Sequence, residues 1–365
     1  MIRFRKRPPL SSLTPRRVCL IKPSALGDIV QTLPVLSALR RLWPEAHIAW
    51  VVKNCFADLL TDHPELDEVI GFTPRTMSGM FLRETRHLWR ALREDPFDVA
   101  IDLQGLLRSG YMAWASGAPR RIGFSCGREG STWCYTDQLE VPPTDMPVMQ
   151  RYWKVVRAFG GSNDIPPAQL GVLPEHRLWA ARQILSRDQP LLAIHPGAGW
   201  QTKRWPARHF LRIAQLAAEH HDATILLIGG PDCRAAADEI VAGFGGPIID
   251  LCGRTTLRQL AALCEQADVV LSGDSGPMHL AAAVGTRVVS IFTCTNTIRH
   301  APHGQEESVI ASQVACAASH RKLCSHMLCM DELTPFRVWP KLSAELQNVV
   351  EQRTVPQLVP LRACA

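Results

Sequence analysis

A turn of small and acidic residues, Gly273-Asp274-Ser275-Gly276, has the composition of an anion-binding loop. It follows a short apolar run at 268–271 and precedes a segment that predicts a helix over 277–284. Glycines let a ligand approach the main chain, and the first N–H groups of a helix have no partner within it. The positive end of the helix dipole favours negative charge at the same place. The turn therefore predicts a phosphate site, although Asp274 or Ser275 could instead only cap the helix.

A lysine beside a second glycine-containing loop is another candidate for phosphate binding. Lys203 and Thr202 follow Gly197 and Gly199 and precede a helix expected to begin at Pro206. A positive charge just ahead of a helix start can act on a phosphate oxygen together with the helix dipole. The sequence leaves an ordinary solvated lysine as the alternative.

A carboxylate that could serve as a base follows the first apolar strand. Asp28 ends the loop 24–28, and the apolar segment after it predicts a helix over 29–43. A carboxylate there could take a proton from an attacking sugar hydroxyl, as an inverting glycosyl transfer requires. The spacing of Asp28 and Gln31 also fits a capping box, so a purely structural role stays open.

Residues suited to an acidic ligand are concentrated between 81 and 128. The helix expected over 81–94 carries arginines about one turn apart, at Arg83, Arg86, Arg90 and Arg93. The loops that follow carry Gln104, Arg108, Arg120, Arg121 and Arg128. Because a guanidinium group can bind phosphate or carboxylate through paired hydrogen bonds, this region is a candidate acceptor-binding surface. A solvated helix face is the alternative for the helical set.

A cluster of cysteines near the end of the chain raises the question of a metal site. Cys316, Cys324 and Cys329 lie with His320 and His326 in a segment without regular periodicity. The close Cys-x-x-Cys pairs of structural zinc sites are missing, so we expect no metal, with zinc binding as the minority alternative. The other cysteines mostly stand singly in apolar segments and are expected to be reduced thiols.

The elements that position these residues alternate between strands and helices in both halves of the chain. Apolar runs predict strands over 18–22, 47–53, 69–72, 99–102, 191–195, 223–229, 248–252, 269–272 and 287–292. Helices are expected between them, including 150–159, 206–220, 232–243 and 256–266. Irregular stretches are expected over 119–135 and 141–147, with a linker over 160–174. The pattern predicts an α/β protein of two doubly wound, Rossmann-like domains that face each other across a cleft.

Four loops of unusual composition each follow one of these strands. They are 24–28, 102–105, 195–199 and 273–276. Ligands of open parallel sheets bind at the carboxyl ends of the strands. The four loops are therefore expected to form the functional site.

The charge of the chain is unevenly distributed. Of 365 residues 46% are hydrophobic, and the formal net charge is +6. The first 17 residues hold six arginines or lysines and no acid, which leaves the rest of the chain neutral. We expect this segment to be a disordered arm attracted to anionic membrane lipid, and no nucleic acid partner, because no aromatic platform or known module accompanies the charge. Neither a signal peptide nor an apolar run of the ~18 residues needed for a membrane span is evident, so we expect a cytoplasmic protein, peripheral at the inner face of the membrane.

Several segments together resemble the heptosyltransferase family of lipopolysaccharide glycosyltransferases. They are IKPSALGDIVQTLPVLSALRRLWPEAHIAWVV, DLQGLLRSGYMAW, RRIGFSCGREGSTWCY, HPGAGWQTKRWP and LSGDSGPMHLAAAVGTRVVSIFTCTN, in this order from about residue 18 to about residue 300. The segment CMDELTP, which ends the cysteine cluster, is similar to the tail of the second-heptose subgroup.

The resemblance implies a GT-B enzyme that uses ADP-heptose, inverts the anomeric centre and needs no metal or other cofactor. By motif position, Asp28 would be the catalytic carboxylate, Lys203 a ligand of the donor phosphates, and Asp274, Ser275 and Gly276 the turn that holds the donor. His279 falls at the family's histidine in that motif. One departure concerns the acceptor: many members have a histidine where this chain has 144–147, Thr-Asp-Met-Pro.

These expectations combine into one domain plan and one leading function. The plan is a basic arm over 1–17, an acceptor-binding domain over 18–172, a nucleotide-sugar-binding domain over 173–352 and a tail over 353–365. The leading function is transfer of a heptose from ADP-heptose to an inner-core lipopolysaccharide acceptor. The alternatives are the same chemistry with another nucleotide sugar or acceptor, a nucleotide-sugar-binding protein without catalysis, and a metal-dependent interaction protein.

Overall fold

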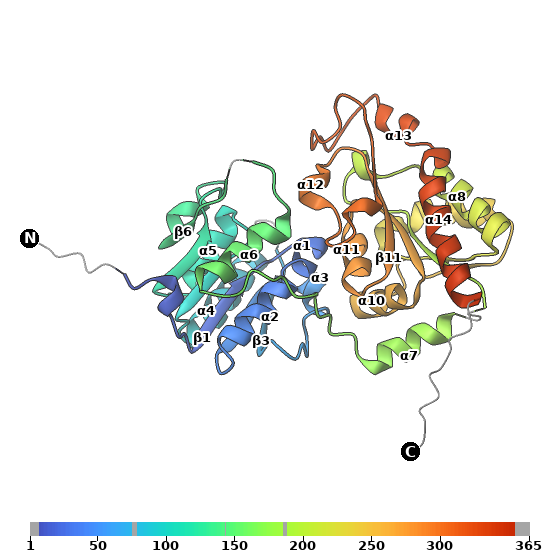
Figure 1. Cartoon of the computed structure of the whole chain (residues 1–365). Coiled ribbons are helices and arrows are strands. Elements are labelled where there is room, and N and C mark those ends of the chain that lie inside the picture. The colour runs from blue at the N-terminus through green and yellow to red at the C-terminus, as the bar shows by residue number, and fades with distance from the viewer. Residues whose placement is uncertain (1–6, 75–78, 143, 185–187, 355–365) are drawn as a thin grey trace, which may run out of the picture. The chain divides into compact units, whose positions relative to one another are not determined.

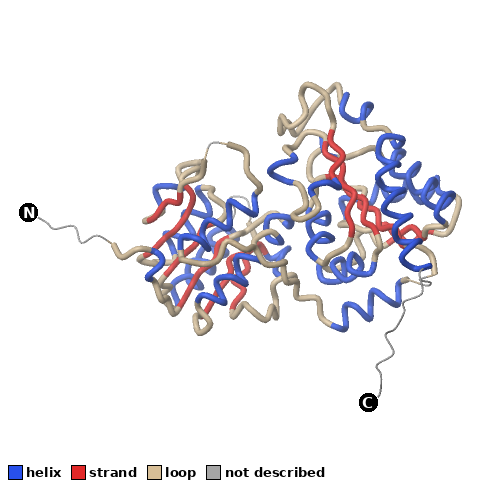
Figure 2. Tube along the Cα trace, in the orientation of Figure 1, coloured by secondary structure: helices blue, strands red, loops and turns tan. Residues whose placement is uncertain are grey.

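The computed structural model of the chain describes residues 7–74, 79–142, 144–184 and 188–354 (Figure 1). The chain divides into two compact units. The first holds the residues up to Leu173 together with Thr256–Ala261 and Ile298–His303, and the second holds the rest. Figure 2 shows that the strands of each unit gather together with helices beside them. Each unit is therefore an α/β body with a sheet of its own.

The first unit is built on a six-stranded parallel sheet of order β3-β2-β1-β4-β5-β6. In the central strand, Val18–Ile21 have no exposed area, as expected where helices cover both faces of a parallel sheet. The strands are β1 (Arg17–Ile21), β2 (His47–Lys53), β3 (Glu68–Phe72), β4 (Val99–Asp102), β5 (Arg120–Phe124) and β6 (Asp137–Leu139).

The helices of the first unit connect these strands. Leu92 and Met112, from two of the helices, pack with the strand residue Ile21 in one core cluster. The helices are α1 (Leu26–Val30), α2 (Leu33–Leu42), α3 (Asn54–Ala57), α4 (Gly79–Glu94), α5 (Leu107–Ala115) and α6 (Val148–Ala158), with the short 3-10 helices η1 (Leu10–Ser12) and η2 (Ser131–Cys134).

The second unit has a six-stranded parallel sheet of order β12-β11-β10-β7-β8-β9. Followed in chain order from β7, this is the same strand order as in the first unit, so the two units share one Rossmann-like topology. The strands are β7 (Leu191–His195), β8 (Thr224–Leu227), β9 (Ile248–Asp250), β10 (Val269–Gly273), β11 (Arg287–Phe292) and β12 (Val309–Ala311).

The long last helix of the second unit packs into its core. Val338, Leu342 and Leu346 of this helix are buried in the same cluster as the strand residues Leu271 and Ile291. The helices that follow residue 173 are α7 (Pro174–Gln183), α8 (Ala207–His221), α9 (Arg234–Phe244), α10 (Leu257–Gln266), α11 (Gly276–Ala283), α12 (Thr297–His300), α13 (Leu328–Glu332) and α14 (Pro335–Thr354), with the 3-10 helices η3 (Gln201–Lys203), η4 (Pro231–Cys233) and η5 (Glu306–Ser308). The first part of α10 and most of α12 group with the first unit.

The predicted fold class is confirmed, since all the strands expected from apolar runs are present. The sequence analysis missed β5, β6 and β12. The last two are short strands at the edges of their sheets, and β5 begins with two arginines, so none of them has a long apolar run. Arg120 of β5, in a stretch that was expected to be irregular, pairs with Asp137 of β6 at 2.8 Å.

The single helix predicted over 29–43 is wrong. The segment forms α1 and α2, with a break at Gln31 and Thr32, and Pro34 lies in the first turn of α2. Proline is tolerated there because the first N–H groups of a helix have no intrahelical acceptor. The correction moves the helix start ahead of Asp28, which matters for the role of that residue.

The N-terminal arm also differs from the expectation. Residues 1–6 lie outside the described residues, but the segment from Arg7 onward contacts the first unit. Arg7 donates to the carbonyl oxygen of Thr136 at 2.8 Å, and Trp43 donates from its indole nitrogen to the carbonyl oxygen of Leu13 at 3.1 Å. The arm supplies the donor in the first bond and the main-chain acceptor in the second, so the segment from Arg7 is packed on the unit, and Arg17 already belongs to β1.

Candidate functional site

In each sheet the first three strands are added in one direction and the next three in the other. This switch point lies between β1 and β4 in the first unit and between β7 and β10 in the second. The loops beside it are those that follow these four strands. Strand register places Ile21 beside Asp102, and His195 beside Ser272. These are the four loops that the sequence analysis selected. Ligands of doubly wound sheets bind at this point, because the flanking loops diverge there.

In the first unit, Asp28 is held by three donors. Lys22, the residue after β1, places its Nζ atom 3.3 Å from Oδ2, and the main-chain N–H of Ala25 donates to the same oxygen at 3.3 Å. The hydroxyl of Tyr152, on α6, donates to Oδ1 at 2.9 Å. A carboxylate has about four lone-pair positions, so one position on Oδ1 is left for a further donor. With 30% of its side chain exposed, Asp28 is accessible to a ligand hydroxyl.

The charge of Lys22 decides the ionisation of Asp28. Burial alone would raise the pKa of the carboxyl, but the positive charge of Lys22 and the hydrogen bonds from Tyr152, Lys22 and Ala25 bring it below its usual value. Lys22 is itself 2% exposed, and its Nζ atom lies 5.0 Å from the centre of the Tyr152 ring. Asp28 is therefore an ionised acceptor at neutral pH.

The capping alternative for Asp28 needs a correction. Ala25, not Asp28, is the N-cap of α1, and Asp28 occupies the third helical position, from which its carboxylate accepts the N–H of Ala25. Gln31 lies at the other end of this helix. The expected capping pair of Asp28 and Gln31 is therefore absent, although Asp28 does satisfy one main-chain donor at the helix start.

The loop after β4 contains a second carboxylate, Asp102, with a structural role. It is fully buried and accepts hydrogen bonds from the hydroxyls of Tyr135 at 2.6 Å and Ser109 at 2.8 Å, and from the N–H of Gln104 at 2.8 Å. Burial raises its pKa despite these donors. Asp102 thus fixes the loop that carries Gln104, whose side-chain oxygen accepts from the N–H of Ser24 at 3.4 Å in the Asp28 loop.

In the second unit, two of the predicted phosphate-binding residues are in direct contact. Nζ of Lys203, at the end of η3, lies 2.7 Å from Oδ2 of Asp274, and it lies 4.5 Å from the ring centre of Trp200. The loops meet closely because Gly273 has no side chain: a Cβ atom there would lie 3.2 Å from the carbonyl oxygen of Lys203. The pair places a cation directly ahead of α11.

The start of α11 is not capped by the side chain of its N-cap residue, Ser275. The Ser275 hydroxyl instead contacts the hydroxyl of Ser272 at 2.9 Å and Nδ1 of His195 at 3.2 Å. This arrangement favours the anion-binding interpretation over capping, because a Ser275 cap would have occupied one of the first N–H groups. Gly276 begins the helix, and His279 is buried within it.

The remaining predicted donor-binding residues shape the loop after β7. Gly197 is packed against the side chain of Cys233, whose sulfur would lie 2.3 Å from an added Cβ, whereas Gly199 has open space beside it. Thr202 is buried, and its hydroxyl donates to the carbonyl oxygen of Arg321. Its side chain therefore holds the loop and is not directed to a ligand.

The predicted acceptor residues differ in whether their side chains are exposed or bonded to the main chain. Arg108 and Arg128 are exposed, and the N–H of Arg128 donates to the carbonyl oxygen of Gly105 at 2.8 Å. Arg121 instead donates to the carbonyl oxygens of Cys134 and Ala118 at 2.7 and 2.8 Å, so its guanidinium group supports the local fold. On α4, Arg86, Arg90 and Arg93 are exposed, and the side chain of Arg83 lies outside the described residues.

The metal alternative gains no support from the structure. Across residues 7–74, 79–142, 144–184 and 188–354, no group of three or more His, Cys, Asp or Glu side chains is placed to hold a metal ion. The described cysteines of the expected cluster, Cys316, Cys324 and Cys329, are free.

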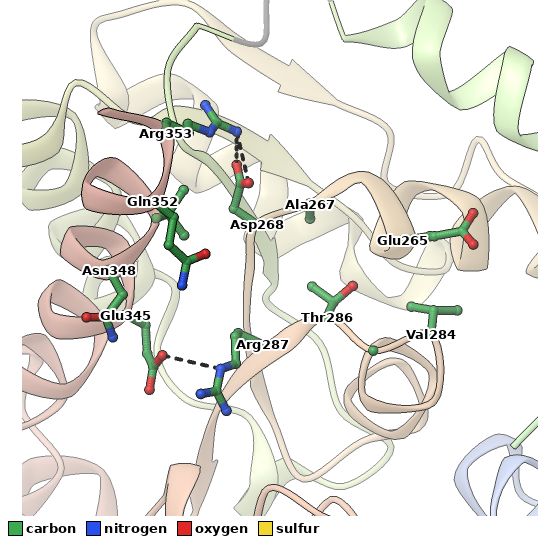
Figure 3. Close-up of a pocket in the computed structure, with 12 residues that line it drawn as sticks. Glu265, Ala267, Asp268, Val284, Thr286, Arg287, Glu345, Asn348, Gln352 and Arg353 are labelled. Atoms are coloured by element: carbon green, nitrogen blue, oxygen red, sulfur yellow. Dashed lines mark hydrogen bonds and ion pairs between the residues drawn. The ribbon is translucent and has the colours of Figure 1, made fainter. Parts of the chain in front are cut away.

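A surface hollow of the second unit lies away from the predicted site (Figure 3). Asp268 and Arg287 line it at the amino ends of β10 and β11, and Glu345 and Arg353 line it from α14. Ion pairs join Arg353 to Asp268 at 2.7 Å and Arg287 to Glu345 at 3.7 Å. The amino ends of parallel strands are the opposite edge of this sheet from the loops after β7 and β10, so the hollow is separate from the candidate residues of its own unit.

Comparison with known proteins identifies the family. The sequence pattern of glycosyltransferase family 9 (heptosyltransferase) matches residues 85–329, well over half of the chain. The chain belongs to this family.

Relatives of this family 9 glycosyltransferase match it over most of their length. The lipopolysaccharide core heptosyltransferase OpsX of Haemophilus influenzae is 25% identical over 83% of this chain and 86% of its own. Lipopolysaccharide heptosyltransferase 1 of Pseudomonas aeruginosa is 27% identical over 90% of this chain and 98% of its own. The solved structure of the Escherichia coli ADP-heptose lipopolysaccharide heptosyltransferase II has a TM-score of 0.75, with 23% identity, and covers 92% of this chain and 99% of its own. Enzymes named heptosyltransferase 1 and heptosyltransferase II are thus both similar, and the similarity does not select one subgroup.

Sequence reasoning missed the two side chains that surround Asp28 in this glycosyltransferase. Lys22 is an unusual residue at the end of an apolar strand, and that position was the available signal for it. Tyr152 is 124 residues from Asp28, and no local pattern connects the two.

Cys233 was also missed, because the cysteines were treated as small apolar residues. Hydrogen bonding with Cys252 and with His195 lowers the pKa of Cys233 below its usual value. Its sulfur lies 3.5 Å from Nε2 of His195, beneath the Gly197 loop.

Proposed function

We propose that the chain transfers a heptose from ADP-heptose to an inner-core lipopolysaccharide acceptor, with inversion at the anomeric carbon and without a metal ion. The family match supports heptose transfer. The acceptor is supported by the name of one relative, a lipopolysaccharide core heptosyltransferase. The donor is supported by the name of a relative of known structure, an ADP-heptose lipopolysaccharide heptosyltransferase. The single observation in the structure that carries the proposal is the Lys203 and Asp274 pair ahead of an uncapped α11, at a sheet switch point.

The second unit would bind the donor. The first N–H groups of α11 and the ammonium group of Lys203 would contact the diphosphate, with Gly199 leaving room for it. When the bond between the anomeric carbon and the diphosphate oxygen breaks, negative charge grows on that oxygen. Donors that are already in place stabilise this charge without reorganisation, which is the task a metal ion performs in other transferases.

The first unit would bind the acceptor and supply the base. The acceptor hydroxyl would donate to the remaining position on Oδ1 of Asp28, attack the anomeric carbon and pass its proton to the carboxylate. The new bond forms as the bond to ADP breaks, so each transfer inverts the configuration once. Exposed Arg108 and Arg128, near the Gln104 loop, are the candidates for contact with acidic groups of the acceptor.

Ligand-induced stabilisation tests the donor assignment. We expect ADP-heptose to raise the melting temperature of the protein, because a ligand at 100 times its dissociation constant adds about 2.7 kcal/mol to the free energy of unfolding. UDP-sugars and GDP-sugars, at the same concentration, are the matched comparison. A shift with one of these and none with ADP-heptose would assign another donor. A shift with ADP-heptose but no turnover would favour a binding protein without catalysis.

Lys22 gives a separate test of the base through pH. Asp28 accepts a proton only when it is ionised, so kcat/KM should fall as the pH drops through the pKa of Asp28. Lys22 is the largest influence that lowers this pKa, and Lys22→Met removes it. The acid limb of the pH profile should therefore move to higher pH in the variant. An unmoved acid limb in a folded Lys22→Met protein would mean that another group sets the pH dependence.

A further inference from the structure

Helix α5 of the first unit is apolar on two faces. Met112, Ala113 and Ala115 are buried in the core, yet Tyr111 and Trp114 are 46% and 49% exposed. Leu107 and Arg108 complete the exposed set, which contains no acidic side chain. A helix at the surface of a protein ordinarily presents polar side chains to water, so the outer face of α5 requires an explanation.

The exposed aromatic residues continue onto the elements beside α5. Trp133, in η2, is 89% exposed, and η2 packs on α5 where Gly110 closely approaches Ser131. Trp89, on α4, is also exposed, and α4 is tied to α5 by a hydrogen bond of 2.6 Å from Nε of Arg93 to the carbonyl oxygen of Ala115. The exposed aromatic side chains therefore lie on α5 and on two elements, α4 and η2, that each contact α5.

Arginines accompany these aromatic side chains. Arg86, Arg90 and Arg93 are exposed on α4, and Arg93 also lies over the ring of Trp89 at 5.2 Å. Among the side chains that the structure describes next to this set, the exposed acids are Glu94 at the end of α4, Asp95 after it and Glu129 before η2. We call the set the aromatic-arginine surface, and it consists of Arg86, Trp89, Arg90, Arg93, Leu107, Arg108, Tyr111, Trp114 and Trp133.

We propose that the aromatic-arginine surface binds the headgroup region of an anionic lipid bilayer. Tryptophan and tyrosine favour the membrane interface because one part of the side chain is apolar and another part donates hydrogen bonds. Arginines near an anionic bilayer add electrostatic attraction. An anionic bilayer offers an apolar interior to the aromatic side chains of this surface and negatively charged headgroups to its arginines. The contact is peripheral, since no helix in the described part of the chain is long and apolar enough to span a membrane. The inference does not depend on which sugar is transferred.

Vesicle cosedimentation of the full chain tests the proposal. Vesicles of phosphatidylcholine mixed with phosphatidylglycerol should bind the protein, and vesicles of phosphatidylcholine alone should bind it weakly. Trp114→Ser combined with Trp133→Ser should weaken binding by about tenfold. Arg86→Gln combined with Arg90→Gln should weaken it by a similar factor, mainly at low salt. The matched controls are Phe336→Ser and Arg208→Gln, which change exposed residues on α14 and α8, and both should bind as the wild type does.

Three results would overturn the proposal. One is wild-type protein that stays in the supernatant with both kinds of vesicle at low salt, which would point to a protein partner for this surface. Another is equal binding by the double variants and the wild type. The third is binding that is lost only when residues 1–6 are deleted, which would assign the contact to the N-terminal segment. Quenching of wild-type tryptophan fluorescence by brominated phosphatidylglycerol keeps the test valid if a variant fails to fold, and absence of quenching counts against the surface.

Discussion

Replacing Asp28 by asparagine should lower kcat by about 10² to 10⁴, the usual contribution of a general base. Asparagine keeps one oxygen, which can replace either the acceptor for the N–H of Ala25 or the acceptor for the hydroxyl of Tyr152, and it cannot take the acceptor's proton. Affinity for the donor should change little, because Asp28 lies in the unit without the Lys203 site. Steady-state rates and donor titration on the same preparation would measure both quantities.

The same substitution should also destabilise the protein. It leaves the buried ammonium group of Lys22 without its carboxylate, which costs about 1 to 3 kcal/mol, less than for a fully buried pair because Asp28 is partly exposed. Combining Lys22→Met with Asp28→Asn removes both charges and is the control: unfolding midpoints should recover while the rate stays low. Near-normal turnover by folded Asp28→Asn would show that the carboxylate is not the base. Asp102 would not be the substitute, since it is fully buried with its oxygens bonded.

Replacing Lys203 by alanine should weaken ADP-heptose binding by about 10- to 100-fold, the size expected for one charge-assisted contact to phosphate. The rate should fall as well, because the same ammonium group meets the charge that develops on the leaving diphosphate. Calorimetric titration with ADP and with adenosine would isolate the phosphate contribution. Adenosine carries no phosphate, so its affinity should be nearly unchanged.

Lys203→Ala also removes the ion-pair partner of Asp274. This structural effect has to be separated from the loss of the phosphate contact. Lys203→Arg retains the positive charge and can still pair with Asp274, so it should keep more of the ADP affinity than the alanine variant does. Equal losses for ADP and adenosine in Lys203→Ala would indicate a collapsed loop and would remove the lysine from the phosphate site.

The position of the candidate loops at the ends of strands was predictable from the sequence for a physical reason. Parallel strands in α/β proteins are buried on both faces, and their apolar runs mark where each strand ends. The residues just after four such ends, including Asp28, His195 and Asp274, could therefore be placed at one kind of sheet edge. The same reasoning placed the glycine-containing turn 273–276 between a strand and a helix, where α11 begins.

Contacts between distant segments could not be predicted in this way. The environment of Asp28 depends on Tyr152, which a different helix supplies, and on Lys22, whose charge determines the pKa of the carboxyl. Arg121 was expected to bind acceptor, but its guanidinium group is occupied by two main-chain carbonyls, which only the folded arrangement of β5 and η2 reveals. Composition indicates that an arginine can bind an anion, and the fold decides whether that arginine is available.

The central claim, that this family 9 glycosyltransferase transfers heptose from ADP-heptose to an inner-core acceptor, is tested most directly by the mass of the product. Purified protein would be incubated with ADP-heptose and an inner-core lipopolysaccharide fragment that lacks heptose, with a metal chelator present throughout. We predict that the fragment gains the mass of one heptose residue and that one ADP appears for each product molecule. An unchanged fragment in this mixture, together with a mass gain from a UDP-sugar or GDP-sugar on the same fragment, would contradict the claim.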